Sequence, residues 1–306
     1  MPQATVVKHV VAAVFAAALA VGVGVGLLRE HAGEPAVLEF SAERVAAVEL
    51  THTDLSVRLE LDDSRWWCVE PGPVLPARAD RVMRALSELA AATRVRTVTS
   101  RPYDASRYGL DHRNALEVRV TLEDGSRLGV VLGDDSGSGT YYRLLDREGV
   151  WLSGRRLRNT FPADLKHYIE RRVFPEGTEP GRTRRLAVDS PGDRYELYYE
   201  SFDTWLPREA GLPEPSASQV RAVLAALDGL TGEEIAPVEV LDLGDAEAVV
   251  RAVTALGQHY ELEIHVADAE LWAVGRGPGS LPDRFAARLL PGDVARVLRP
   301  LADLSR

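Results

Sequence analysis

The chain of 306 residues contains a single cysteine, Cys68, which excludes an intramolecular disulfide and a thiolate cluster around a metal. Cys68 stands beside Trp66 and Trp67 in an apolar stretch, where we expect a buried, unreactive thiol. Because proteins of oxidising and reducing compartments can both carry one cysteine, this count assigns no compartment.

Positive charge is also scarce. The chain has 36 Lys and Arg residues against 46 Asp and Glu residues, a formal net charge of -10. Binding to nucleic acid needs a cationic face, so we expect no nucleic-acid partner.

The common catalytic and metal-binding motifs are absent from the sequence. None of the seven histidines belongs to a His-Glu-x-x-His motif, and no Gly-x-Ser-x-Gly elbow occurs. The acidic stretch 133–139 lacks the late glutamate of a calcium loop, so we expect it to be a hairpin connection. The sequence therefore predicts no metal, no cofactor and no enzymatic activity.

The one long apolar run lies near the N-terminus. Residues 10–28 carry no charge and would span about 28 Å as a helix, close to the thickness of a bilayer core. We expect a transmembrane helix there, a cytoplasmic tail over 1–9 and a linker over 29–40. A cleaved signal peptide, with residues 18–20 as the cleavage site, is the alternative.

A sequence unit appears twice after this run. A constant offset of 138 positions relates the two copies, and the offset becomes 132 in a later hairpin. The offset of 138 maps Leu59 onto Leu197, Trp67 onto Trp205, Val82 onto Val220, Leu86 onto Leu224 and Leu89 onto Leu227. The sequence therefore predicts an internal duplication, with a first module over 41–175 and a second over 176–306.

Both copies alternate hairpin patterns with amphipathic helices, which is typical of an α+β fold with antiparallel sheet. In the first module we expect hairpins at 55–69 and 116–132, and a closing helix over 156–169. We also expect Trp67 and Trp151 to correspond to Trp205 and Trp272, and all four to pack in the two cores.

One segment departs from the acidic average. Residues 155–185 contain nine Lys or Arg residues against four acidic ones. Such a patch suits an acidic partner or anionic lipid headgroups, although a solvated Arg-rich surface is the alternative reading. The candidate interaction patch consists of Arg155, Arg156, Arg158, Lys166, Arg171 and Arg172.

Several short motifs stand in one order along the chain: a tryptophan strand at 65–67, a helix start at 76–80, Tyr-Gly-Leu at 108–110, and Arg-Arg-Val-Phe at 171–174. In this order the chain resembles the bacterial domain-of-unknown-function 4340 family over most of residues 10–175, and the second module resembles a degenerate further copy. The resemblance implies a single-pass protein of the bacterial cytoplasmic membrane with an extracytoplasmic main domain. It also implies proximity to ABC-type transporter components, and it assigns no activity.

We therefore expect a membrane-anchored, non-enzymatic accessory or scaffold of an envelope complex, with bilayer lipid and a transporter as partners. One alternative is an anchored ligand-binding or carrier protein that uses the groove between the modules. A less favoured alternative is an envelope hydrolase with a site assembled from distant residues.

Overall fold

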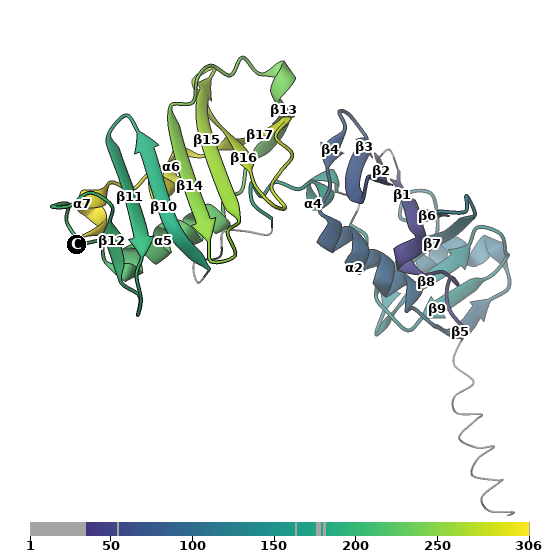
Figure 1. Ribbon diagram of the computed structural model, residues 1–306. Helices are drawn as coiled ribbons and strands as arrows, with labels where there is room; N and C mark the ends of the chain where they lie inside the picture. The colour runs from purple at the N-terminus through teal and green to yellow at the C-terminus, as the bar shows by residue number, and fades with distance from the viewer. Residues whose placement is uncertain (1–34, 54, 163, 176–178, 180–181, 306) are drawn as a thin grey trace, which may run out of the picture. The chain divides into compact units, whose positions relative to one another are not determined.

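The computed structural model describes residues 35–305 except 54, 163, 176–178 and 180–181 (Figure 1). The transmembrane helix expected over 10–28 lies outside the described residues. Within the described residues, no helix combines the length and the apolar character needed to cross a bilayer. The chain divides into two compact units, residues 1–56 with 83–163 and residues 57–82 with 164–306.

The first sheet has nine mainly antiparallel strands in the order β4-β3-β2-β1-β6-β7-β8-β9-β5. Helix α2 (Ala79–Ala90) follows the first hairpin and buries one apolar face, which includes Val82, Leu86 and Leu89. The strands are β1 (Val45–His52), β2 (Leu55–Asp62), β3 (Arg65–Glu70), β4 (Leu75–Pro76), β5 (Arg94–Thr99), β6 (Leu116–Leu122), β7 (Arg127–Ser136), β8 (Gly139–Leu144) and β9 (Val150–Ser153).

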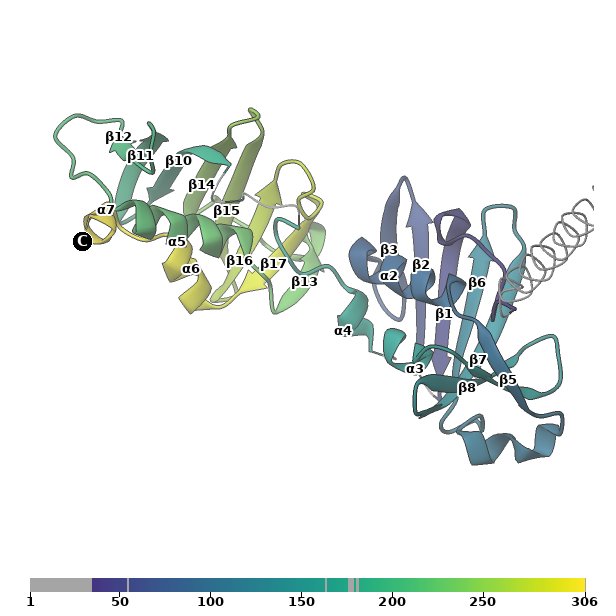
Figure 2. The same cartoon turned by 90° about the horizontal axis from the view of Figure 1, so that it is seen from below.

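The second sheet has eight strands in the order β12-β11-β10-β14-β15-β16-β17-β13. Helix α5 (Ala217–Asp228) lies along one of its faces, followed by the short helices α6 (Pro291–Val297) and α7 (Leu301–Leu304) (Figure 2). The strands are β10 (Thr183–Ser190), β11 (Asp193–Tyr199), β12 (Trp205–Pro207), β13 (Glu234–Pro237), β14 (Ala248–Thr254), β15 (His259–Ala267), β16 (Glu270–Arg276) and β17 (Phe285–Leu289).

The two sheets have the same strand order once β4 is set aside, and in each a helix stands between the third strand and the edge strand β5 or β13. Their registers agree residue by residue. Leu50 pairs with Val118 in the first sheet, and Val188 pairs with Val250 in the second. A bulge also recurs at one place, between Val45 and Ala47 and between Thr183 and Arg185.

The tryptophan correspondence differs from the expectation. In β3 the buried tryptophan is Trp66, which pairs with Leu61 as Trp205 pairs with Tyr199, while Trp67 is only half-buried on the other face. The turn between β11 and β12 is one residue longer than the turn between β2 and β3. One extra residue reverses the face on which every following side chain of the strand lies. Trp272 lies on β16, the counterpart of β8, and so does not correspond to Trp151 on β9.

The acidic stretch 133–139 is a hairpin connection between β7 and β8, as expected, but the strands extend into it, β7 to Ser136 and β8 from Gly139. Its glycines are required by close approach: a Cβ on Gly133 would lie 2.1 Å from the Tyr108 carbonyl oxygen, and one on Gly139 would lie 1.9 Å from that of Ser153. The helix expected over 156–169 is two single turns, α3 (Leu157–Thr160) and α4 (Leu165–Tyr168), because Pro162 interrupts it.

Candidate functional site

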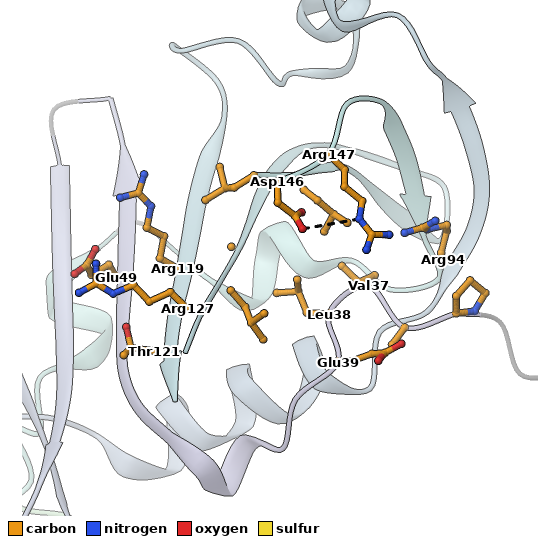
Figure 3. A pocket seen from close by; sticks show the side chains of 16 residues that line it. Val37, Leu38, Glu39, Glu49, Arg94, Arg119, Thr121, Arg127, Asp146 and Arg147 are labelled. Atoms are coloured by element: carbon orange, nitrogen blue, oxygen red, sulfur yellow. Dashed lines mark ion pairs between the residues drawn. The ribbon is translucent and has the colours of Figure 1, made fainter. Parts of the chain in front are cut away.

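A pocket of about 750 Å³ opens within the first unit (Figure 3). One wall is residues 35–39, which we call the strap, because this segment crosses from the N-terminal region onto the sheet. The other walls come from the adjoining ends of β6 and β7 and from residues 144–147 at the end of β8.

Backbone hydrogen bonds hold the strap in place. The Val37 amide donates to the Ala92 carbonyl at 2.8 Å, and the Arg94 amide donates to the Pro35 carbonyl at 2.7 Å. Val37 and Leu38 are buried, so the strap adds apolar surface to the first core. The pocket wall is therefore a fixed part of the fold.

At one end of the pocket lie Arg94, Asp146 and Arg147 (Figure 3). The Arg94 guanidinium lies 4.8 Å from the centre of the Trp151 ring, and its Nε donates to the Tyr142 hydroxyl at 3.2 Å. Burial raises the pKa of Tyr142 against the opposing effect of Arg94, so this hydroxyl stays protonated and neutral.

The carboxylate at this end is Asp146, whose Oδ2 lies 3.8 Å from Nε of Arg147, and both side chains are largely exposed. An ion pair of that length between solvated groups is weak. Arg94 and Arg147 thus bring two guanidinium groups to this end of the pocket, where Glu39 adds a second carboxylate. Over the whole lining four arginines stand against three acidic side chains, so the pocket favours an anion.

At the other end Glu49, Arg119 and Arg127 come together (Figure 3). Arg119 forms an ion pair with Glu117 on its own strand. Arg127 is exposed at the start of β7. The apolar side chains of Val37 and Leu38 lie between the two polar ends, so the pocket can receive a ligand with both polar and apolar parts.

The second sheet has a smaller pocket of about 150 Å³ at the corresponding strands. The cross-strand pair Arg119 and Gly129 is there replaced by Arg251 and Glu261. The Glu261 carboxylate accepts from Nε of Arg251 at 2.6 Å and from Arg276 at 3.0 Å. A carboxylate paired with two arginines thus lines the second pocket, where the first has Gly129.

The structure places the six residues of the candidate interaction patch in two groups, one in each unit. In the first unit, Arg155 pairs with Glu88 and Arg156 donates to the Gly137 carbonyl. Burial lowers the pKa of Arg158, and the nearby Asp134 and Asp135 oppose that shift.

In the second unit, Lys166 lies in α4, and the Arg171 carbonyl accepts from the Gly232 amide. Arg172 forms ion pairs with Glu170 at 3.0 Å and with Asp80 at 3.8 Å. Several of the patch cations therefore already have protein partners, which weakens their use as a free basic surface.

The residues that the structure does describe include no group of three His, Cys, Asp or Glu side chains placed to hold a metal ion. His265 lies on β15 with its Nδ1 2.9 Å from the Gly244 carbonyl oxygen. Burial raises the pKa of the Cys68 thiol to about 12.

The sequence alone did not predict the pocket, because its lining comes from six separate stretches of the chain. One signal was present nevertheless. At the offset of 132 that relates the second hairpins, Gly129 corresponds to Glu261 and Arg127 to His259. A charge and volume difference at matched positions of a repeat marks the place where the two copies have diverged.

A family model described as "Domain of unknown function (DUF4340)" matches residues 66–250, more than half of the chain. The match runs from β3 of the first sheet to β14 of the second, and so extends past the residues 10–175 over which the resemblance was expected. No curated protein and no solved structure matches the chain.

Proposed function

The chain belongs to the DUF4340 family, and we propose that it is a membrane-anchored, extracytoplasmic binding protein. In this proposal the pocket of the first sheet takes an anionic ligand that also has an apolar part. The protein acts as a non-catalytic accessory of an envelope complex, with a transporter of the ABC type as its partner.

The observation that carries the proposal is the pair Arg94 and Arg147 beside the loosely held Asp146. Arginine presents a planar fork of donors that matches carboxylate and phosphate groups. Arg94 keeps its orientation through the Trp151 ring and the Tyr142 hydroxyl, so little side-chain entropy is lost when a ligand binds.

The contrast between the sheets supports the same proposal. We infer that the two sheets derive from one duplicated unit, since they share strand order, register and one bulge. The second pocket is smaller and is lined by the Glu261 carboxylate, so we assign binding to the first copy. The ligand site then lies within one unit, whereas the sequence alternative placed it in a groove between modules.

The anchoring part of the proposal depends on the uncharged run over 10–28. The strap begins seven residues after that run and forms a wall of the pocket. A ligand would therefore bind close to the membrane-proximal end of the folded region.

The test uses the full chain in detergent micelles and the probe 8-anilinonaphthalene-1-sulfonate, which joins a sulfonate to apolar rings. Arg127→Gln and Arg147→Gln each remove one cation that has no role in the core. We expect Arg147→Gln, at the end proposed to bind the sulfonate, to weaken probe binding about tenfold, the effect of one charge-assisted hydrogen bond, and Arg127→Gln, at the opposite end, to weaken it less.

The matched control is Arg194→Gln, which removes an arginine that is 81% exposed and pairs with Asp189 in the second sheet. Control and wild type should bind equally. Equal binding by all four proteins would show that the probe does not use the pocket and would refute the proposal.

A further inference from the structure

Phe202 is 98% exposed, an unusual position for a large apolar side chain. It lies at the tip of the hairpin between β11 and β12, with a positive φ of 47°. This backbone conformation favours glycine, asparagine and aspartate, and bulky residues rarely adopt it. Neither packing nor backbone geometry accounts for phenylalanine at this position.

The hairpin tip is well fixed. The Glu200 amide donates to the Thr204 carbonyl at 2.9 Å, and the Thr204 amide donates to the Ser201 carbonyl at 2.8 Å. Asp203 accepts from Arg221 of α5 at 2.6 Å. Phe202 is thus presented at one place on the surface.

A second apolar tip lies at the same end of the sheet. Leu256 is 75% exposed in the turn between β14 and β15. Strands β11 and β14 both pair with β10, and both turns lie beside the start of β10 (Figure 1). Two strand spacings separate β11 from β14, about 10 Å.

The first sheet provides an internal comparison. Its corresponding turns carry aspartate at both tips, Asp63 with a positive φ of 45° and Asp124 before Gly125. The turn geometry is preserved, because Gly125 and Gly257 have φ values of 80° and 75°. The second sheet has therefore exchanged a charged residue for an apolar one at both tips.

Aromatic rings and arginines surround these tips. The Arg185 guanidinium lies 5.5 Å from the Tyr198 ring, and that of Arg184 lies 4.3 Å from the Tyr199 ring. Tyrosine and arginine side chains have an apolar body and a polar end, which suits the headgroup region of a membrane.

We propose that this end of the second sheet contacts a lipid bilayer, with Phe202 and Leu256 inserted at the level of the headgroups. Two separate convex tips at one end of a sheet can insert into the flat surface of a bilayer together, because fluid lipid can pack around both. A protein partner would need two matching hollows at the same spacing. The contact is independent of the ligand pocket, and it depends on the proposed anchor only to keep the chain near the membrane.

The test attaches an environment-sensitive NBD fluorophore to cysteine in the full chain. Phe202→Cys and Leu256→Cys report on the second sheet, and Asp63→Cys and Asp124→Cys place the same label in the corresponding turns of the first. The native Cys68 can stay, because its buried thiol is protonated at labelling pH. Each protein is mixed with vesicles of phosphatidylcholine and phosphatidylglycerol at millimolar lipid, some carrying nitroxides high on their acyl chains.

We expect quenching at 202 and 256 at least threefold stronger than at 63 and 124. The change Leu256→Asp should reduce quenching at 202 at least twofold. Equal or absent quenching at the four sites overturns the proposal, as does a label at 202 that is shielded only when the protein associates with a second copy of itself.

Flotation of the full chain with vesicles after a high-salt wash reports on anchoring separately. A chain that does not float refutes the proposed anchor, whereas quenching alone decides the contact of Phe202 and Leu256.

Discussion

Replacing Phe202 with glycine should stabilise the hairpin between β11 and β12. The side chain is 98% exposed, so its removal forfeits almost no burial. A non-glycine residue in the left-handed region costs about 1–2 kcal/mol. Glycine avoids that cost but gains freedom in the unfolded chain worth about 0.5–1 kcal/mol. The expected net stabilisation is about 0.5–1 kcal/mol.

The measurement is hydrogen exchange of the Glu200 amide, which closes the hairpin through its bond to Thr204. A stabilisation of that size slows exchange by roughly two- to fivefold when exchange requires opening of the hairpin. Asp63→Gly in the first sheet is the control and should gain less, because aspartate tolerates a positive φ. Faster exchange in Phe202→Gly would refute the reasoning, since it would mean that the ring packs against the protein.

Three further predictions test other parts of the structure. Burial raises the pKa of Glu196, but hydrogen bonds from Tyr198, Arg208 and Arg185 outweigh it and lower the pKa from 4.5 to about 2. The stability that Glu196 contributes should therefore be present above pH 4.5 and lost as pH falls through 2. In denaturant titrations, Glu196→Gln should reduce this loss of stability at low pH. The Cys68 thiol should not react with a maleimide at pH 8 in the folded protein and should react fully in denaturant, as mass spectrometry would show. Gly139→Ala should destabilise the first sheet by about 1–3 kcal/mol in urea, because its Cβ would meet the backbone carbonyl oxygen of Ser153, which no side-chain rotation can move.

The shared pattern of the two sheets was predictable from the sequence because it depends on buried positions. Leu86 and Leu224 are fully buried at corresponding turns of α2 and α5, and Val48 and Leu186 face the two cores from β1 and β10. Burial restricts such positions to apolar residues of similar size, so the offset of 138 is visible in the letters. The family assignment, which used the same stretches, is confirmed by the match over 66–250.

The side-chain directions in the short strands were less predictable. The face of a strand residue depends on parity, and one extra residue in the turn before β12 makes Trp205 the counterpart of Trp66. The extent of the strands around 133–139 was also not predictable. The stretch is a hairpin connection as expected, but Gly133 and Gly139 lie in its strands, where neighbouring carbonyl oxygens leave no room for a Cβ.

The pocket and the apolar tips were not predicted from the sequence for a common reason. Both are differences between two copies of one fold, which the offset of 132 aligns, but only the strand registers show where the differing residues lie. Gly129 stands opposite Arg119 in the first sheet, and Glu261 stands opposite Arg251 in the second. The sheet accommodates either residue at this position, because the Glu261 carboxylate pairs with Arg251.

At the hairpin tips the second sheet has apolar residues where the first has charged ones. Aspartate, which suits both turns, remains in the first sheet, while the second carries Phe202 and Leu256 without any gain in packing. The packing of the second sheet gives no reason for an exposed phenylalanine in this strained conformation, so we look for the reason in a contact outside the sheet. If both proposals hold, the two copies have different roles, with a polar pocket in the first and an apolar contact surface in the second. A duplicated fold allows this division, because each copy keeps the core that stabilises it while its turns and outer strand faces change.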